Sequence, residues 1–311
     1  MLKKIFISCI LIIALLSFVV SLLGGKNKIE TTKKIASGGD SVAVINIAGP
    51  MFSGSGGVPR LFSEAEGANS GTIMKQLRKA GEDKSVKAVL LRINSPGGSV
   101  TAAEEIAREI ARFKETSKKP IVATLGNSGA SAAYYIAAPC DKIYANNSTL
   151  TGSIGVYMGG VNLQELYKKI GVTSVLIKSG EHKDIMSSTR PMTEEEKEII
   201  QSMVDEMYLD FITVVSEGRK LPLEQVRSLA DGRVYTGKQA HALGLVDEIG
   251  NYYDALDATG KLAGLKGTPK VKSYDKVADW SNIFLESFAQ KIAQGLLSKW
   301  APAEAESWNK G

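Results

Sequence analysis

Three short loops of small residues each follow a predicted strand and provide candidate groups for chemistry at a carbonyl carbon. They comprise residues 95–99 (SPGGS), 126–131 (GNSGAS) and 151–155 (TGSIG). Ligands of α/β proteins bind outside the carboxyl ends of parallel strands, so we expect the three loops to converge on one site. Small residues let backbone N–H groups approach a reacting carbonyl oxygen and form an oxyanion hole. Each loop alone is most simply a tight turn, so only their combination supports the prediction.

A serine nucleophile in such a site needs a base, and the sequence contains only two histidines, His182 and His241. His241 lies in a helical pattern and is expected at the surface, and neither histidine has a recognisable Ser-His-Asp setting. Lysine can replace histidine if burial lowers its pKa from about 10.4 towards neutrality. A neutral amine then accepts the serine proton and returns it to the leaving amine. From composition alone, Lys183 would be an ordinary solvated lysine.

Two further residues near these candidates are interpreted as structural. Ser128 lies three residues before Ser131, but its G-N-S-G context differs from the G-x-S-x-G turn of hydrolases, so it is expected to be a loop residue. Asp184 follows Lys183 directly. An ion pair between them would keep the lysine charged and oppose a role as base, so Asp184 is not assigned to the chemistry.

Four motifs, in this order and spacing, resemble the signal peptide peptidase A family of the short bacterial type, within the crotonase/ClpP-like superfamily. The motifs are LRINSPGGS, GASAAYY, LTGSIGV and KSGEHKDIMS, and the similarity continues through DGRVYTGKQAHALGLVDEIG, covering residues 41–251. The resemblance implies a crotonase/ClpP-like fold and a membrane-anchored serine endopeptidase. Its expected substrates are cleaved signal peptides and other hydrophobic or unfolded peptides, and it implies no cofactor and no metal.

The resemblance also implies roles for individual residues. Ser131 matches the nucleophile and Lys183 the general base. Gly98 and Ala132 match the two backbone donors of the oxyanion hole, and Ser153 matches the hydroxyl that orients the lysine amine. In relatives of this length the lysine comes from a neighbouring subunit. We therefore expect a ring-like homo-oligomer with shared active sites.

One departure from the family pattern concerns the nucleophile motif, which is usually Ser-Gly-Gly-Tyr-Tyr but here reads SAAYY at residues 131–135. An alanine at position 132 still offers its N–H if its φ is negative, whereas a positive φ would cost about 1–2 kcal/mol. The departure leaves open a catalytically impaired membrane scaffold of the same fold. A crotonase-type enzyme that processes acyl-CoA is a second alternative, but an N-terminal membrane anchor argues against it.

The elements that would position these residues alternate between strands and helices, which predicts an α/β fold with a largely parallel sheet and surrounding helices. Strands are expected from Ser41 and at residues 86–93, 120–125, 141–145 and 173–178; helices are expected at 72–80, 101–114, 193–217, 223–230 and 236–243. Capping boxes are expected at Thr101 with Glu104 and at Thr193 with Glu196.

The chain divides into four predicted regions. Residues 5–23 carry no charge, a run longer than the core of a signal peptide, so 1–24 is predicted to be a single-pass membrane anchor. Residues 25–40 form a linker, 41–274 the peptidase domain and 275–311 an amphipathic C-terminal tail. We expect the anchor in a bacterial cell membrane and the catalytic domain outside the cytoplasm.

Composition excludes several other classes of protein. The chain has 38 basic and 33 acidic residues, a net charge of +5, and the basic residues are scattered without aromatic interleaving, which argues against nucleic-acid binding. Its two cysteines form no CxxC pair, which argues against a zinc or redox site. Cys9 lies in the apolar N-terminal segment, so Cys140 is expected to have no intrachain disulfide partner.

Overall fold

A largely parallel sheet forms the centre of the computed structural model, which describes residues 39–54 and 67–274. The main strand order is β10-β1-β4-β5-β6-β9, and every neighbouring pair in it is parallel. These strands are β1 (Ser41–Ala48), β4 (Val86–Ser95), β5 (Ile121–Ala130), β6 (Lys142–Ala145), β9 (Glu248–Ile249) and β10 (Lys270–Ser273). The central strands read as nearly continuous apolar runs because both faces of a parallel sheet are buried.

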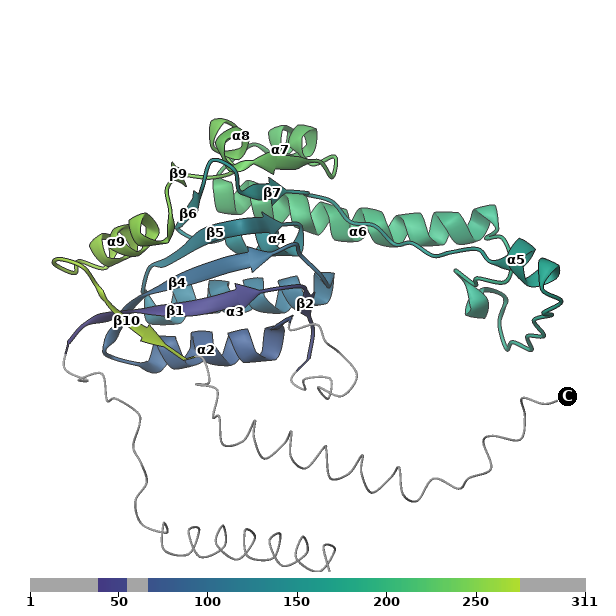
Figure 1. Ribbon diagram of the computed structural model, residues 1–311, viewed down its shortest axis with the longest axis horizontal. Helices are drawn as coiled ribbons and strands as arrows, with labels where there is room; N and C mark the ends of the chain where they lie inside the picture. Colours follow the sequence, from purple (N-terminus) through teal and green to yellow (C-terminus); the bar gives the residue numbers. More distant parts are fainter. Residues whose placement is uncertain (1–38, 55–66, 275–311) are drawn as a thin grey trace, which may run out of the picture. The chain divides into compact units, whose positions relative to one another are not determined.

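Helices cover both faces of this sheet (Figure 1). On one face, α2 (Ser70–Glu82) and α3 (Val100–Ser117) bury side chains against the larger core, and on the other α9 (Tyr252–Leu262) packs over a smaller core. Successive residues of β1 alternate between the two cores: Ala43 and Ile45 belong to the larger, Val42 and Val44 to the smaller. This alternation is the two-residue period of a strand.

The candidate site lies where three strand ends meet shorter elements. The end of β5 leads into α4 (Ala132–Ala137), and β7 (Leu150–Gly152) runs parallel to this end of β5. On its other side β7 pairs antiparallel with β8 (Val234–Thr236). The end of β4 leads towards a two-stranded sheet made of β2 (Met51–Phe52) and β3 (Ala68–Asn69).

The rest of the described chain is helical or lacks regular structure. It contains α5 (Gln164–Lys169), the 3₁₀ helix η1 (Glu181–Asp184), α6 (Glu194–Arg219), α7 (Leu223–Leu229) and α8 (Gly237–Ala242). The predicted capping box at the start of α6 is confirmed: the Glu196 N–H donates to Thr193 Oγ1 at 3.1 Å, and the Thr193 N–H donates to the Glu196 carboxylate at 3.0 Å.

Two local predictions are wrong. Residues 173–178 form no strand; Val175 and Ile177 are 84% and 95% exposed. Their β-branched composition suits a half-buried pleated surface, but no strand among residues 39–54 and 67–274 pairs with them. The helix predicted from Thr101 begins at Val100, because the Ser99 hydroxyl caps it by accepting a hydrogen bond from the Ala102 N–H. Thr101 therefore lies inside the first turn.

Several predicted segments fall outside the described residues. These are the anchor at 1–24, nearly all of the linker at 25–40 and the tail at 275–311. Across residues 39–54 and 67–274, no helix has both the length and the apolar character needed to cross a membrane. Cys140 is buried and unpaired in this part of the chain, and burial raises the pKa of its thiol to about 12.

Candidate active site

Ser131 occupies a sharp turn between β5 and α4. Its backbone has φ 54° and ψ −127°, a conformation that residues with a side chain rarely adopt. The Ser131 N–H donates to the carbonyl of Gly152 at 2.9 Å, and the Ser131 carbonyl accepts the N–H groups of Tyr134 and Tyr135. Every residue of α4 is buried. The packed helix and strand thus hold a turn whose strain costs about 1–3 kcal/mol, an arrangement that clusters at active sites.

Two glycines bring the end of β4 against this turn. Gly97 has φ 111°, and a Cβ there would lie 2.8 Å from Ser131 Cβ. Gly98 has φ 152°, and its Cβ would lie 2.3 Å from the carbonyl oxygen of Met51. Neither position has room for a side chain. The SPGG sequence therefore permits a close backbone approach to Ser131.

The N–H group of Gly98 is directed away from β2. The Met51 N–H donates to the Gly97 carbonyl at 2.8 Å, and the Ser99 N–H donates to the Met51 carbonyl at 3.0 Å. In this parallel bridge the residue between the two bonds, Gly98, turns its own N–H to the opposite side. Gly98 is exposed, so this donor can reach a bound molecule.

A second backbone donor comes from Ala132, the first residue of α4. The first N–H groups of a helix have no partner within the helix and favour negative charge. Ala132 has a helical, negative φ, so its methyl group brings no strain; the positive φ falls on Ser131 instead. The alanine in place of the usual glycine is compatible with an oxyanion hole.

A small apolar pocket adjoins Ser131, Gly98 and Ala132. Its volume is about 20 Å³, and no charged side chain lines it. The wall opposite the serine comes from α6, whose Phe211 packs on Tyr135 with ring centroids 5.0 Å apart. The contribution of α6 to the site was not predicted, because a helix pattern does not indicate which part of the sheet the helix covers.

Ser153 is a backbone neighbour of Ser131. It follows Gly152, whose carbonyl accepts the Ser131 N–H, and its own N–H donates to the Arg233 carbonyl at 2.8 Å. Like Ser131, it has a positive φ, 49°. The pairing of β5 with β7 therefore brings together two of the predicted site residues, Ser131 and Ser153.

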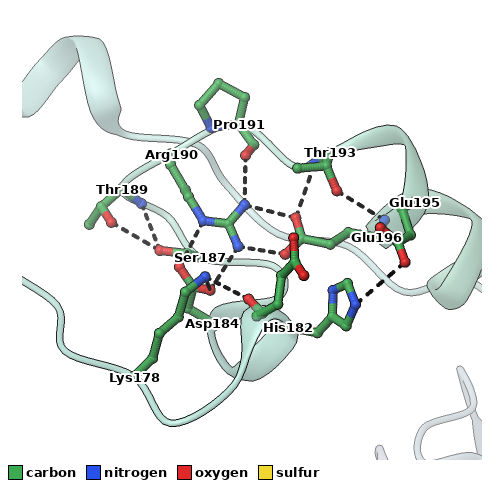
Figure 2. A network of polar contacts seen from close by, with 11 residues as sticks. Lys178, His182, Asp184, Ser187, Thr189, Arg190, Pro191, Thr193, Glu195 and Glu196 are labelled. Carbon is green, nitrogen blue, oxygen red and sulfur yellow. Dashed lines mark hydrogen bonds and ion pairs between the residues drawn. The ribbon is translucent and has the colours of Figure 1, made fainter.

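Lys183 lies elsewhere in the chain, on η1, and is exposed. It is absent from the lining of the pocket beside Ser131. Its neighbour Asp184 is bound by Arg190, which also binds Glu196 in the first turn of α6 (Figure 2). The segment that carries Lys183 is thus attached at the N-terminal end of α6, near α5 (Figure 1).

The middle of α6 packs near the nucleophile: Met207 and Phe211 line the pocket beside Ser131, and Phe211 packs on Tyr135. Glu196 and Phe211 are fifteen residues apart in one helix, which corresponds to about 22 Å along its axis at 1.5 Å per residue. A lysine side chain is far too short to cover this distance. A single chain therefore does not bring Lys183 to Ser131.

Asp184 does not pair with Lys183. It accepts two hydrogen bonds from Arg190, at 2.7 and 2.8 Å, and one from Lys178 at 2.7 Å. The Arg190 guanidinium, with help from Lys178, holds the pKa of the Asp184 carboxyl well below its usual range. The interpretation of Asp184 as a structural residue agrees with these contacts.

The remaining candidates are not assembled with Ser131. His182 neighbours Lys183 on η1, where its Nε2 lies 3.6 Å from a Glu195 carboxylate oxygen. His241 is exposed on α8. The Ser128 N–H donates to the Asn94 side chain at 3.2 Å, and Ser128 does not line the pocket. Ser131 is thus the serine that shares the pocket with both predicted oxyanion donors.

Comparison with known proteins identifies the family. The model of peptidase family S49 matches residues 113–266, and a Clp protease model matches residues 60–151. A protein of Enterococcus faecium, named provisionally as a signal peptide peptidase SppA, is 40% identical over 79% of this chain and 77% of its own length. A ClpP1 mutant structure from Listeria monocytogenes aligns with TM-score 0.42 and 17% identity, covering 68% of this chain and 93% of its own.

Two longer relatives also match. Protease 4 of Haemophilus influenzae is 35% identical over 84% of this chain and 42% of its own length. The chloroplastic serine protease SPPA of Arabidopsis thaliana is 32% identical over 77% of this chain and 35% of its own. This chain, with its α/β fold and largely parallel sheet, belongs to peptidase family S49 and is a serine protease of the SppA type.

Proposed function

We propose that this protease is an endopeptidase that uses Ser131 as nucleophile and Lys183 of a neighbouring copy as general base. The observation that carries the proposal is the strained Ser131 turn, which lies between two backbone donors and beside an apolar pocket. Strained backbone of this kind places a nucleophile at the top of an α/β sheet in other hydrolases. The two N–H groups supply the hydrogen-bond donors that stabilise the oxyanion of a tetrahedral intermediate.

The proposed reaction proceeds through an acyl-enzyme. The neutral Lys183 amine takes the proton of Ser131 as its Oγ attacks the peptide carbonyl carbon. The N–H groups of Gly98 and Ala132 stabilise the resulting oxyanion, and the lysine returns the proton to the leaving amine. Water then attacks the ester with the same base. Ser153, next to Ser131 through Gly152, is proposed to orient the amine.

The separation of Lys183 from Ser131 within one chain supports a site shared between copies. The segment at residues 157–177, which precedes Lys183, exposes apolar side chains, among them Tyr157, Val175 and Ile177 at 91%, 84% and 95%. Exposed apolar surface of this extent marks an interaction site in a soluble domain. A neighbouring copy that covers it would bring the Lys183 segment of one chain against another chain.

The proposed substrates are cleaved signal peptides and other hydrophobic or unfolded peptides. An apolar pocket without charged lining residues favours an apolar side chain beside the scissile bond. Gly98, whose N–H faces away from β2, can pair with an extended peptide as a strand edge does. The apolar run at residues 5–23 supports single-pass anchoring in a bacterial cell membrane, with the catalytic domain extracytoplasmic, close to such substrates.

The proposal is tested by co-expressing two full-length variants that carry different affinity tags. Hybrid assemblies are purified in detergent through both tags and assayed on a fluorogenic apolar peptide. Ser131→Ala and Lys183→Ala should each be inactive alone. In a randomly mixed symmetric ring, about a quarter of the sites would combine an intact serine with an intact lysine. Activity in either single variant would show that the wrong residues were assigned, and no activity in the hybrid would exclude a shared site.

A further inference from the structure

We propose that Arg190 is the positioning residue that holds the base-bearing turn η1 in its working place. The inference rests on the proposed role of Lys183. It concerns a residue that neither contacts Ser131 nor carries out chemistry. The polar contacts that surround η1 give Arg190 this role (Figure 2).

Apart from Arg190, polar contacts of Lys178 and His182 hold the turn that carries Lys183: Lys178 Nζ donates to the Glu181 carbonyl at 2.6 Å and to Asp184 at 2.7 Å, and His182 Nε2 lies 3.6 Å from a Glu195 oxygen. None of the four residues of η1 is buried, so no apolar core fixes its position. The residue that follows shortly after, Met186, has φ 62°, which adds backbone strain rather than stability. Within the described part of the chain, the Lys183 amine itself makes no hydrogen bond or ion pair. The neighbours of the lysine must therefore fix the turn.

Arg190 supplies the link from this turn to a rigid helix. Its Nε and Nη2 donate to the two Asp184 carboxylate oxygens at 2.7 and 2.8 Å. Its Nη1 and Nη2 donate to the two Glu196 oxygens at 2.8 and 2.5 Å. A guanidinium can bind both carboxylates in a bidentate manner at once because its N–H donors lie in one plane. An ammonium group cannot reproduce this double bidentate contact.

The helix end of the link is well anchored. Glu196 is 2% exposed. As the third residue of α6 it completes the capping box by accepting the Thr193 N–H. The guanidinium and this backbone donor lower the pKa of Glu196 to about 2. The carboxylate is therefore charged, buried and fixed to the first turn of α6. The hydrogen bonds from Arg190 therefore hold Asp184, the residue next to Lys183, in a fixed position relative to α6.

Arg190 also keeps Asp184 from pairing with the lysine. With Lys178, it balances the charges of Asp184 and Glu196. Without Arg190, two carboxylates would face one remaining cation of the network, and Asp184 would be free to bind the Lys183 amine in its charged form. Position and protonation of the base thus depend on the same guanidinium.

The decisive test is complementation in tandem-purified hybrid assemblies of the full-length chain. We expect Arg190→Ala alone to lower kcat about 10- to 100-fold, because a misplacement of about 1 Å can cost a hundredfold. In hybrids, Arg190→Ala should behave like Lys183→Ala. Paired with Ser131→Ala it should regain activity to the level of the Lys183→Ala/Ser131→Ala hybrid. Paired with Lys183→Ala it should fall to about half of its own residual level, because half of the base-bearing segments then lack the lysine.

The outcomes separate this inference from the proposed function. Failure of the Lys183→Ala/Ser131→Ala hybrid would refute the shared dyad itself. Success of that hybrid together with complementation between Arg190→Ala and Lys183→Ala would place the Arg190 defect on the nucleophile side and overturn the inference. So would an unchanged kcat in Arg190→Ala. If Arg190→Ala does not assemble, Arg190→Lys replaces it in the same hybrids. This variant retains the positive charge but cannot bind both carboxylates in a bidentate manner.

Arg78→Ala is the matched control, because Arg78 also forms a bidentate pair with a buried carboxylate, Glu109, at 2.9 and 2.9 Å. It lies on α2, away from the site, and its loss should leave kcat at the wild-type level. A kcat loss equal to that of Arg190→Ala would show a general effect of losing such a pair.

The pH profile supplies a readout that a merely structural role would not move. Activity rises with pH as the base loses its proton. The rising limb should move to higher pH in Arg190→Ala, which leaves excess negative charge near Lys183, and to lower pH in Asp184→Asn, which removes it. The charged and titratable groups around Lys183 come from two places. Glu181, His182 and Asp184 belong to η1 itself, and Lys178, Arg190, Glu195 and Glu196 belong to the segments that contact it. Identical profiles in all variants would contradict the charge argument.

Discussion

The nucleophile region and the base region of this chain are built in opposite ways. Around Ser131, the backbones of β4, β5 and β7 meet so closely that glycines are required, and α4 is buried throughout. Around Lys183, none of the four residues of η1 is buried, and ion pairs hold the turn to α6. The first region is complete within one chain. In the second, Arg190 pairs with Asp184 and Glu196, but His182 Nδ1 has no hydrogen-bond partner and the apolar side chains of residues 157–177 are uncovered, which is how half of an interface is built.

The largest expected effect comes from the complete region. Ser131→Ala should lower kcat/KM at least about a thousandfold, because the nucleophile and its base act as a unit. The measurement is hydrolysis of a fluorogenic peptide, with Ser128→Ala as the control that retains activity. A Ser131→Ala variant that keeps more than a tenth of wild-type activity would rule out the assignment.

A second prediction concerns the close approach of the β4 end. Gly98→Ala should destabilise the protein by about 1–3 kcal/mol, because its Cβ would meet the Met51 carbonyl at 2.3 Å. Activity should fall as well, since the Gly98 N–H would shift. Chemical denaturation and peptide hydrolysis measure both. Gly81→Ala, where the nearest atom would be an ordinary 3.5 Å away, should show neither effect.

The third prediction is that the base region fails first in acid. The pKa of Glu196 is lowered to about 2 in the folded chain, and that of Asp184 is also lowered, against about 4 for both types of carboxyl in unfolded chains. Their stabilisation is full above about pH 5 and is lost as pH falls through the folded values. Limited pepsin digestion at pH 3 should cut within residues 157–190 before it cuts the sheet. Initial cleavage in β4 or β5 would contradict the contrast between the regions.

The smallest expected effect is at Ala132. Ala132→Gly should cost about 0.5–1 kcal/mol, because glycine loses more backbone entropy in a helix and Ala132 already has a helical φ. Thermal denaturation measures the change. A gain in stability would mean that the methyl group is strained in the buried wall of the pocket.

The sequence predicted the complete region better than the exposed one. The apolar runs of β4 and β5, and the small residues after them, indicated the strand ends that meet at Ser131, because strand period and chain direction are local properties. The positive φ of Ser131 was not predicted, since the turn is held by Gly97, in the loop after β4, and by Gly152 at the end of β7. Residues 173–178 have the composition of a strand, but strand formation needs a neighbouring strand, and the described residues provide none there.

Arg190 was also missed, although a signal was present. It lies six residues after Asp184 and six before Glu196, directly ahead of a recognisable capping box. Its residue type gave no hint, because most arginines are solvated. Only the fold shows that both carboxylates converge on it. A charged residue between an expected base and an expected helix cap is therefore a candidate positioning group.

The length of α6 bears on when such a protease can act. In a lone chain, Glu196, to which the Lys183 segment is attached, and Phe211, which lines the pocket beside Ser131, are about 22 Å apart along that helix. A newly synthesised copy would then be harmless to its surroundings, and cutting would begin only once enough copies had accumulated to meet. Specific activity would rise with enzyme concentration and fall on dilution. The length of α6 would thus keep the protease inactive until copies assemble, without the need for a propeptide or a separate inhibitor.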